Sequence, residues 1–202
     1  MFELHTIFPT VVMAAELSTG LNQSETKTIN QFLETVRPSN GNQVSLNLDV
    51  LDHPNLSRLR GFIDESILQY SQSLNIINTR FHITQSWLNL AFKGEFLNEH
   101  YHPNHIWTGT FYVETGEDDR LEMRYTNPCN YELEVSHYSH LNSLSWDFPA
   151  KKNWLIIFPS NVRHFVPPTK NERRISLSFN VSPTIPFGKE FDYSQVRSGY
   201  AG

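Results

Sequence analysis

The hydrophobic positions follow two different spacings on the two sides of residue 80. In residues 29–36 and 56–70, apolar side chains recur every three or four positions. This spacing places them on one face of an α-helix, so it predicts two amphipathic helices. Ser24 is the expected N-cap of the first helix, which the Pro-Ser-Asn-Gly run at 38–41 ends, and residues 53–55 open the second.

After residue 80 the pattern changes to short runs of β-branched and aromatic residues, separated by turn signals such as those at 116–119 and 167–169. Runs of this kind predict β-strands, and no helical spacing interrupts them. Strands that follow one another without helices favour an antiparallel sandwich or barrel. The predicted strands are 81–90, 107–114, 121–125, 154–158 and 175–181.

One domain is expected to hold all 202 residues, because a chain of this length fits a single hydrophobic core. We expect a helical N-terminal part at about 1–79, packed on one sheet of a β core at about 80–183. The fold class predicted from the pattern is therefore mainly β with some α.

The composition is that of a globular chain without a basic surface for nucleic acid. Charged residues make up 18% and hydrophobic residues 39%, and the formal net charge is -5. The lone Cys129 cannot form an internal disulfide, which suits a reducing compartment. Residues 1–15 carry neither the basic nor the apolar region of an export signal, and no apolar run is long enough to span a membrane. We therefore expect a cytoplasmic protein without nucleic-acid or membrane partners.

Closely spaced histidines provide the candidate chemistry. On a β-strand, residues i and i+2 share a face, so His100 and His102 can present their imidazoles to one metal ion. A third ligand must come from elsewhere, and His164, on a later strand or at its end, is the candidate. Imidazole suits Fe, Zn, Cu or Ni. Taken alone, the His-x-His pair also fits two exposed or hydrogen-bonded histidines.

The spacing around these histidines is similar to that of the two cupin metal motifs. Gly94 precedes His100, and Pro159 precedes His164, with the rhythm of those motifs. The glutamate that a cupin carries shortly after its His-x-His pair is missing, because residues 104–106 are Asn-His-Ile. An ordinary cupin is therefore disfavoured.

Five motifs stand out along the chain: Ser86-Trp-Leu-Asn89, His100-x-His102-Pro103, Thr108-Gly-Thr-Phe-Tyr-Val113, Phe158-Pro-Ser160 with His164, and Arg174-Ile-Ser-Leu-Ser-Phe-Asn180. Taken together they resemble a known family, the 2-oxoglutarate-Fe(II) oxygenases found in bacteria and marine phages, which are relatives of the prolyl hydroxylases. The resemblance covers residues 7–180. It implies a double-stranded β-helix, or jelly roll, with helices outside one sheet, Fe(II) as the metal and 2-oxoglutarate as the cosubstrate. A phage origin would place the protein in the host cytoplasm.

The resemblance assigns His100 and His164 to the first and last metal-ligand positions. His102 stands where the related hydroxylases carry an aspartate. Three neutral imidazoles leave the metal one charge more positive than two histidines and a carboxylate, and three-His sites also serve Zn. A carboxylate from elsewhere stays open as the third ligand, although Glu99 has the wrong strand parity.

The same resemblance implies a cosubstrate site around Arg174, placed where related enzymes clamp the distal carboxylate of 2-oxoglutarate. A guanidinium offers planar, bidentate donors that stay charged when buried. Ser176 and Ser178 share its strand face, so either hydroxyl can donate a second hydrogen bond. Tyr112 resembles the tyrosine that helps hold this carboxylate, and Asn89 lies on the strand entering the site. Without the resemblance, Arg174 fits a surface ion pair.

The implied activity is that of a dioxygenase that hydroxylates a substrate while 2-oxoglutarate is converted to succinate and CO2. Two alternatives stay open, a three-His cupin-like metalloenzyme that needs no 2-oxoglutarate and a non-catalytic jelly-roll binding protein. The substrate is not fixed, because the loops around a pocket select it, and small molecules and protein side chains both remain. A homodimer also stays open.

Overall fold

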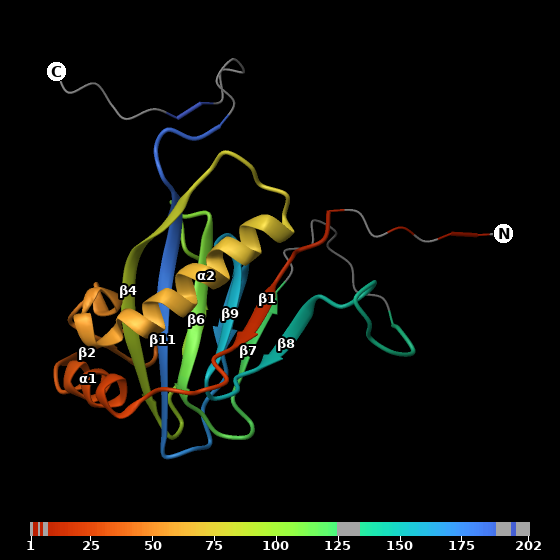
Figure 1. Ribbon diagram of the computed structural model, residues 1–202. Helices are drawn as coiled ribbons and strands as arrows, with labels where there is room; N and C mark the ends of the chain where they lie inside the picture. Colours follow the sequence, from red (N-terminus) through yellow and green to blue (C-terminus); the bar gives the residue numbers. More distant parts are fainter. Residues whose placement is uncertain (1, 4, 6–7, 125–133, 189–194, 197–202) are drawn as a thin grey trace.

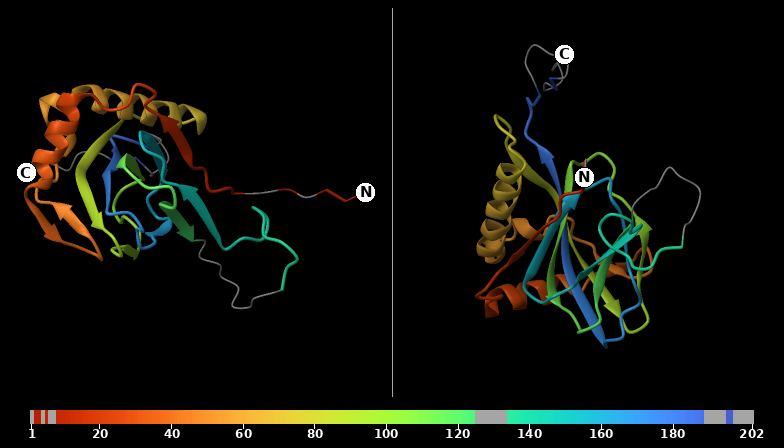
Figure 2. Two further views of the ribbon diagram at one scale, coloured as in Figure 1. Left: turned by 90° about the horizontal axis from the view of Figure 1, so that it is seen from below. Right: turned by 90° about the vertical axis from the view of Figure 1, so that its right-hand side faces the viewer.

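The computed structural model describes residues 2–3, 5, 8–124, 134–188 and 195–196. Two antiparallel sheets face each other, and two helices cover the outer face of the larger sheet (Figure 1 and Figure 2, left). This arrangement confirms the predicted jelly roll with helices outside one sheet. The predicted single domain, with its division near residue 80, stays a prediction.

The larger sheet has seven strands in the order β1-β9-β6-β11-β4-β3-β2. Its centre is β11, which pairs with β4 on one side and β6 on the other. Alternate residues of this strand point to opposite faces of the sheet, one toward the helices and one toward the second sheet. The strands are β1 (Met13–Glu16), β9 (Trp154–Pro159), β6 (Trp107–Glu114), β11 (Arg173–Pro183), β4 (Phe81–Phe92), β3 (Gln43–Ser45) and β2 (Val36–Pro38).

The smaller sheet has four strands in the order β5-β10-β7-β8. These strands are β5 (Leu97–His100), β10 (Arg163–Val166), β7 (Arg120–Arg124) and β8 (Ser145–Pro149). Two separate apolar clusters fill the protein. The larger lies between the main sheet and the helices, and the smaller lies between the two sheets around Tyr112, Ile156 and Phe158.

Helix α2 (Ser57–Ser73) supplies one side of the larger cluster. Its buried residues recur at helical spacing and pack against Leu88, Phe111 and Phe179 of the sheet. The predicted helix at 56–70 is therefore confirmed, with a 3-10 turn η2 (Pro54–Leu56) before it. The 3-10 turn η1 (Val50–Asp52) and the α-helix α1 (Gln23–Leu33) complete the helical layer. No helix in the described parts of the chain has both the length and the apolar character needed to cross a membrane.

The first helix starts and ends earlier than predicted. Its N-cap is Asn22 rather than Ser24, because the Asn22 side chain accepts from the backbone of Glu25 while the Glu25 carboxylate accepts from the backbone of Asn22. The helix ends at Leu33, and Val36 begins β2 instead of closing the helix. The turn signal at 38–41 thus closes the β2–β3 hairpin and not the helix.

The five predicted strands are confirmed as β4, β6, β7, β9 and β11, with β6 matching at both ends. Tyr125, the predicted end of β7, and the lone Cys129 lie outside the described residues. The other six strands have three to five residues each, too short to give a clear pattern in the sequence. Three of them, β1, β2 and β3, come from the part expected to be helical and extend the main sheet.

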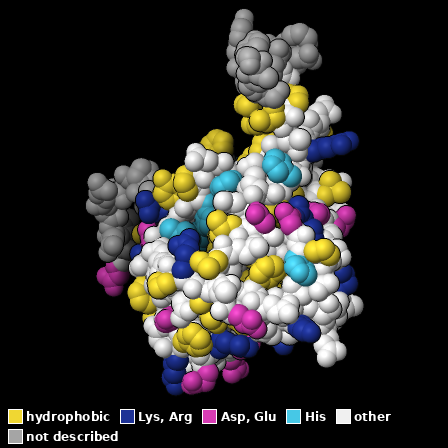
Figure 3. All heavy atoms as spheres, turned by 90° about the vertical axis from the view of Figure 1, so that its left-hand side faces the viewer, with side chains coloured by type: hydrophobic (Ala, Val, Ile, Leu, Met, Phe, Trp, Pro, Cys, Tyr) yellow, Lys and Arg dark blue, Asp and Glu magenta, His cyan; other side chains and the backbone are white. Residues whose placement is uncertain are grey.

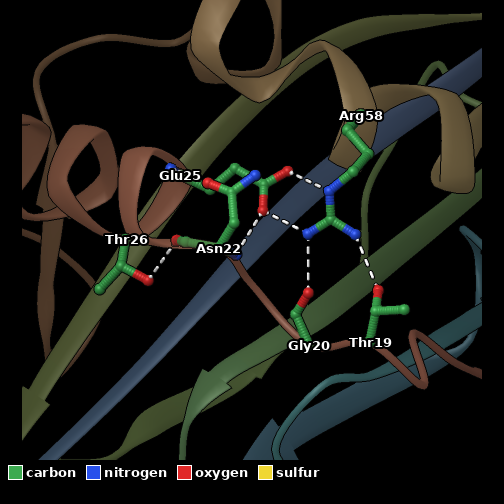
Figure 4. Close-up of polar contacts among 6 residues, drawn as sticks. All are labelled: Thr19, Gly20, Asn22, Glu25, Thr26 and Arg58. Carbon is green, nitrogen blue, oxygen red and sulfur yellow. Dashed lines mark hydrogen bonds and ion pairs between the residues drawn. The ribbon is translucent and has the colours of Figure 1, made fainter.

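An ion pair between the buried Glu25 and the partly exposed Arg58 ties α1 to α2. The Glu25 side chain is fully buried, and its two oxygens accept from Arg58 Nε at 3.1 Å and Nη2 at 2.5 Å. Arg58 also donates to the Thr19 hydroxyl at 2.9 Å and to the Gly20 carbonyl at 2.7 Å, as Figure 4 shows. Both helix starts and the turn after β1 are therefore held by one guanidinium.

We expect Arg58→Ala to lower the free energy of unfolding by about 1–3 kcal/mol, because it leaves the buried Glu25 carboxylate without its cation. Arg60→Ala is the matched control, since Arg60 pairs with the exposed carboxylates of Asp52 and Asp64, and it should cost less than about 1 kcal/mol. Urea denaturation followed by circular dichroism measures both. Equal losses in the two variants would contradict a special role for the Glu25–Arg58 pair.

Candidate metal centre

Three histidines meet at one end of the smaller sheet. His100 is the last residue of β5, and it lies directly opposite His164 of β10 in the antiparallel register. His102 lies just beyond the end of β5, where its backbone N–H donates to the Ser160 carbonyl at 2.9 Å. The predicted grouping of the three is therefore found, although the His-x-His pair does not share one strand.

The imidazoles converge on a common point. One potential ligand nitrogen of each ring lies within 4.8 Å of those of the other two. The ring centroids of His100 and His164 are 4.3 Å apart, and those of His102 and His164 are 5.3 Å apart. Among the residues that the structure describes, this is the one group of His, Cys, Asp or Glu close enough to hold an ion.

Backbone carbonyls fix the tautomer of two of the rings. His100 Nδ1 lies 2.7 Å from the Asn98 carbonyl, and His164 Nδ1 lies 2.9 Å from the Val162 carbonyl. Because a carbonyl oxygen only accepts, each Nδ1 must carry the proton, which leaves Nε2 with a free lone pair. This is the form in which histidine binds a metal.

Burial keeps the imidazoles uncharged. It lowers the pKa of His102 to about 4 and that of His164 to about 3, with further lowering from the neighbouring His100. The pKa of His100 is lowered as well, chiefly by burial and against the hydrogen bond to Asn98. Metal ligands must be deprotonated, so at neutral pH all three rings are ready to bind.

No carboxylate joins the cluster. Glu99, which sequence parity excluded, pairs instead with Arg124 at 3.4 Å and Arg163 at 3.3 Å. Among the described residues, no Asp or Glu lines the cavity that contains the histidines. The three-imidazole set is thus the donor set the fold offers, and it suits Fe(II), Zn, Cu or Ni.

The cavity lies between the two sheets and opens at their edge. Its volume is about 290 Å³, and Figure 3 shows histidine side chains in a hollow with a cationic side chain beside them. Trp87 forms part of its wall and stacks on His102 with ring centroids 5.7 Å apart. Phe158 meets His164 edge-on from the interior. These rings restrict water around the histidines.

Arg174 lies in the same cavity and is not a surface ion pair. It is 5% exposed, and its Nη1 lies 3.5 Å from the buried Asp119 carboxylate and 3.4 Å from the Pro167 carbonyl. Arg173, by contrast, pairs with Glu114 at the surface. Burial lowers the Arg174 pKa, and the Asp119 carboxylate acts against that shift, so the guanidinium stays charged.

The hydroxyl of Tyr112 is an unsatisfied hydrogen-bonding group at this cavity. The side chain is buried, its oxygen has no hydrogen-bond partner, and burial raises its pKa while Arg174 acts against the shift. A buried hydroxyl without a partner costs about 1–3 kcal/mol, so a ligand oxygen held jointly by Tyr112 and Arg174 would satisfy it. The residues present therefore fit a carboxylate at this position.

The other predicted cosubstrate residues line the same cavity. Ser176 and Ser178 share the inner face of β11 with Arg174, as predicted. The Asn89 amide donates to Ser178 Oγ at 2.9 Å and to Ser176 Oγ at 3.5 Å, and Thr110 lies 3.1 Å from Ser178. The structure brings all the predicted site residues together, and their individual roles stay predictions.

Sequence reasoning missed two polar groups of the site. Asp119 was read only as part of a turn, yet its carboxylate contacts Arg174 and accepts from Gly116 N–H at 2.9 Å. Thr110 was read only as a strand residue. His105 stays outside the cluster and lies 3.3 Å from Thr84 and Ser182 hydroxyls.

Comparison with known proteins agrees with this geometry. Residues 85–180 match the family described as "Putative 2OG-Fe(II) oxygenase". The matched segment contains the three histidines, Arg174, Tyr112 and Asn89. No curated protein matches the chain.

Solved structures share the fold at low sequence identity. A prolyl-4-hydroxylase from Pseudomonas putida is 15% identical with a TM-score of 0.58, covering 86% of this chain and 93% of that one. HygX from Streptomyces hygroscopicus, solved with nickel, 2-oxoglutarate and hygromycin B, is 12% identical with a TM-score of 0.56, covering 87% and 84%. The viral collagen prolyl hydroxylase of Paramecium Bursaria Chlorella virus-1 is 10% identical with a TM-score of 0.53, covering 86% and 96%. The three-histidine cluster and the buried Arg174 both lie inside residues 85–180, the segment that matches the 2OG-Fe(II) oxygenase family.

Proposed function

We propose that this oxygenase hydroxylates its substrate with Fe(II) held by His100, His102 and His164, and with 2-oxoglutarate held at Arg174. The observation that carries the proposal is a single cavity lined by the three uncharged imidazoles and by the buried Arg174 guanidinium. The Tyr112 hydroxyl lies in the same cavity without a hydrogen-bond partner among the described residues. When bound, Fe(II) and 2-oxoglutarate supply the oxidation, in which 2-oxoglutarate and O2 yield succinate and CO2 while one oxygen atom enters a substrate C–H bond.

The residues of this chain have binding and positioning roles. The three imidazoles would hold the metal, since their potential ligand nitrogens lie within 4.8 Å of one another at the end of the smaller sheet. Arg174 and Tyr112 bind the distal carboxylate of 2-oxoglutarate, and Asp119 holds the guanidinium in place. Ser178, oriented by Asn89 and Thr110, adds a polar contact to the same wall.

The charge of the donor set bears on the choice of cosubstrate, because three imidazoles lack the negative charge that a carboxylate ligand would contribute. The metal keeps one more positive charge, which favours an anionic cosubstrate that chelates it. This supports 2-oxoglutarate over a neutral ligand. The three-His enzyme that needs no 2-oxoglutarate stays the alternative, since its metal site would have the same imidazoles and leave Arg174 without an anion.

We place the reaction in the cytoplasm, with a small molecule or protein side chain as substrate and no nucleic-acid partner. The net charge of -5 and a cavity that is small compared with a nucleic-acid groove support this placement. A reducing compartment also keeps iron in its ferrous form.

The test is anaerobic addition of Fe(II) and then 2-oxoglutarate to metal-free protein. We expect one metal per chain, a visible metal-to-ligand charge-transfer band, and succinate once O2 is admitted. Metal binding without the band, together with O2 uptake but no succinate, would support the alternative metalloenzyme. Protein that binds no metal, and whose thermal stability ignores Fe(II) and Mn(II), would support a non-catalytic jelly roll.

A further inference from the structure

The β2–β3 hairpin forms a wall of the cavity opposite β6. Its residues continue a row across the main sheet, because Arg37 pairs with Val44, Val44 with Asn89, and Asn89 with Ser176. Directly opposed residues in an antiparallel sheet lie on the same face. The register therefore turns Arg37 toward the cavity, where it lies among the lining residues.

The tip of this hairpin is fastened to the strand that carries His100. Phe96 N–H donates to the Gly41 carbonyl at 3.2 Å, and Asn98 donates to the carbonyl and the side chain of Asn40 at 3.0 and 3.1 Å. Gly41 has a φ of +101°, and a Cβ there would lie 2.9 Å from the Phe96 carbonyl oxygen. The wall is thus built as a fixed part of the site.

Among the described residues Arg37 has no anionic partner, although nearly every other described arginine has one. Seven of the nine described arginines lie within 4.0 Å of a carboxylate, and the two without one are Arg37 and Arg80. Arg80 lies outside the cavity, whereas Arg37 lines it. Arg37 is exposed to solvent where it lines the cavity, and a cationic side chain beside a cavity that no described Asp or Glu lines attracts an anion.

A second group on the hairpin also lacks a partner. Asn42 is 4% exposed, and neither its side-chain oxygen nor its nitrogen makes a hydrogen bond. It lines the same cavity as Arg37. Leaving both a donor and an acceptor unsatisfied is costly in a folded protein, so this amide points to a ligand that supplies them.

The anion at Arg37 cannot be the cosubstrate if the proposed function holds. The two carboxylates of 2-oxoglutarate are then taken by the metal and by Arg174. The three strand spacings from β2 to β11 put the Cα atoms of Arg37 and Arg174 about 15 Å apart, near the two ends of the row. A second anion is therefore needed to pair with Arg37.

We infer that Arg37 and Asn42 recognise the substrate through an anionic group, so that this oxygenase acts on a small carboxylic acid or phosphate monoester. The inference rests on the proposed function, since the hydroxylated carbon must lie between this anchor and the histidines. Arg37 provides planar charged donors to the anion, and the Asn42 amide hydrogen bonds to a neighbouring polar group of the same molecule.

The test uses the holoenzyme with Fe(II) and 2-oxoglutarate and a library of matched pairs. One arm pairs carboxylic acids with their primary amides, and the other pairs phosphate monoesters with their parent alcohols. Succinate above the substrate-free background, and a product heavier by one oxygen atom, are the readouts by mass spectrometry. We expect an anionic member of one arm to be turned over at least tenfold faster than its neutral partner.

Variants of the wall then assign the anion to Arg37. Arg37→Gln should lower kcat/KM for the anionic substrate by roughly 10- to 1,000-fold, with the KM for 2-oxoglutarate within twofold, and Arg37→Lys should restore part of the loss. Asn42→Ala should raise the substrate KM by a smaller factor. Arg80→Gln, the other unpaired arginine, is the control and should behave as wild type.

Several results would overturn the inference. They are a library in which no anionic member stimulates turnover, neutral members that react as well as their anionic partners, or an Arg37→Gln variant with unchanged kcat/KM. A rise in the KM for 2-oxoglutarate alone would assign Arg37 to the cosubstrate instead. Failure of the proposed function is distinguishable, because it removes the charge-transfer band and the substrate-free succinate that these results leave in place.

Discussion

His164→Ala is expected to abolish Fe(II) binding and, with it, formation of succinate. His164 is the most buried of the three imidazoles, and its Nδ1 proton is directed to the Val162 carbonyl so that Nε2 faces the cluster. Mutating groups that merely orient a metal ligand costs 10- to 100-fold in affinity, so loss of the ligand itself should cost at least about 100-fold. Competition with a chelating dye for Mn(II) and metal analysis of purified protein measure this loss.

Two comparisons separate ligand loss from damage to the fold. His100→Ala removes a less buried ligand and should give the same loss of metal. His105→Ala removes a nearby imidazole that lies outside the cluster, 3.3 Å from the Thr84 and Ser182 hydroxyls, and it should bind metal as wild type does. Stoichiometric metal in folded His164→Ala protein would remove this residue from the ligand set.

His102→Asp examines the departure from the family pattern. A carboxylate at this position would recreate two histidines and an acid, and Trp87 would lose its stacked partner. This variant tests whether position 102 supplies the third metal ligand. His100 and His164 are held by strand pairing, whereas His102 lies beyond the end of the strand.

The metal cluster was predictable from the local His-x-His pair and the family resemblance, although the strands that carry His100 and His164, β5 and β10, are too short to be predicted. His100 and His102 are only two residues apart in sequence, so almost any extended conformation places them on one face and close together. The candidate third ligand, His164, came from the spacing of its motif and from the family resemblance, and the structure places it opposite His100 in the β5–β10 pairing. The three histidines do group as predicted, but His102 lies beyond the end of β5 and does not share the strand with His100.

Short elements could not be predicted, since tertiary pairing and not local pattern creates them. Residues 36–38 and 43–45 form strands of three residues each, held by the main sheet on one side. In isolation, Val36 fits the helical spacing of the preceding segment as well as it fits a strand. The consequence for function is direct, because these strands place Arg37 in the cavity.

Contacts distant in sequence were likewise hidden. Asp119 meets Arg174 only because the turn after β6 folds back beneath the start of β11. A run of acidic residues near a glycine indicates a turn, and in this turn Asp118 is solvated and pairs with Lys170. Nothing in the sequence distinguishes the exposed Asp118 from the buried Asp119.

Arg174→Ala is expected to weaken 2-oxoglutarate binding by roughly 30- to several-thousand-fold, which corresponds to the loss of about 2–5 kcal/mol for a buried charge pair. The guanidinium is almost fully buried, so bulk water cannot replace its hydrogen bonds to the distal carboxylate. Arg174→Lys keeps the charge but not the planar pair of donors, so its affinity for 2-oxoglutarate should lie between those of the wild type and Arg174→Ala. Titration of the charge-transfer band under anaerobic conditions gives the dissociation constants.

The neighbouring arginine makes this prediction specific. Arg173→Ala removes the same side chain one position earlier, where it pairs with Glu114 at the surface, and it should leave 2-oxoglutarate affinity unchanged. Because Arg174→Ala also leaves Asp119 buried without its cation, Arg174→Ala with Asp119→Asn is the variant that restores the fold without restoring the cosubstrate site. If that folded double variant binds 2-oxoglutarate as tightly as wild type, Arg174 is only the partner of Asp119. If the loss persists, charge recognition at Arg174 accounts for the affinity, and the imidazoles alone do not hold the cosubstrate.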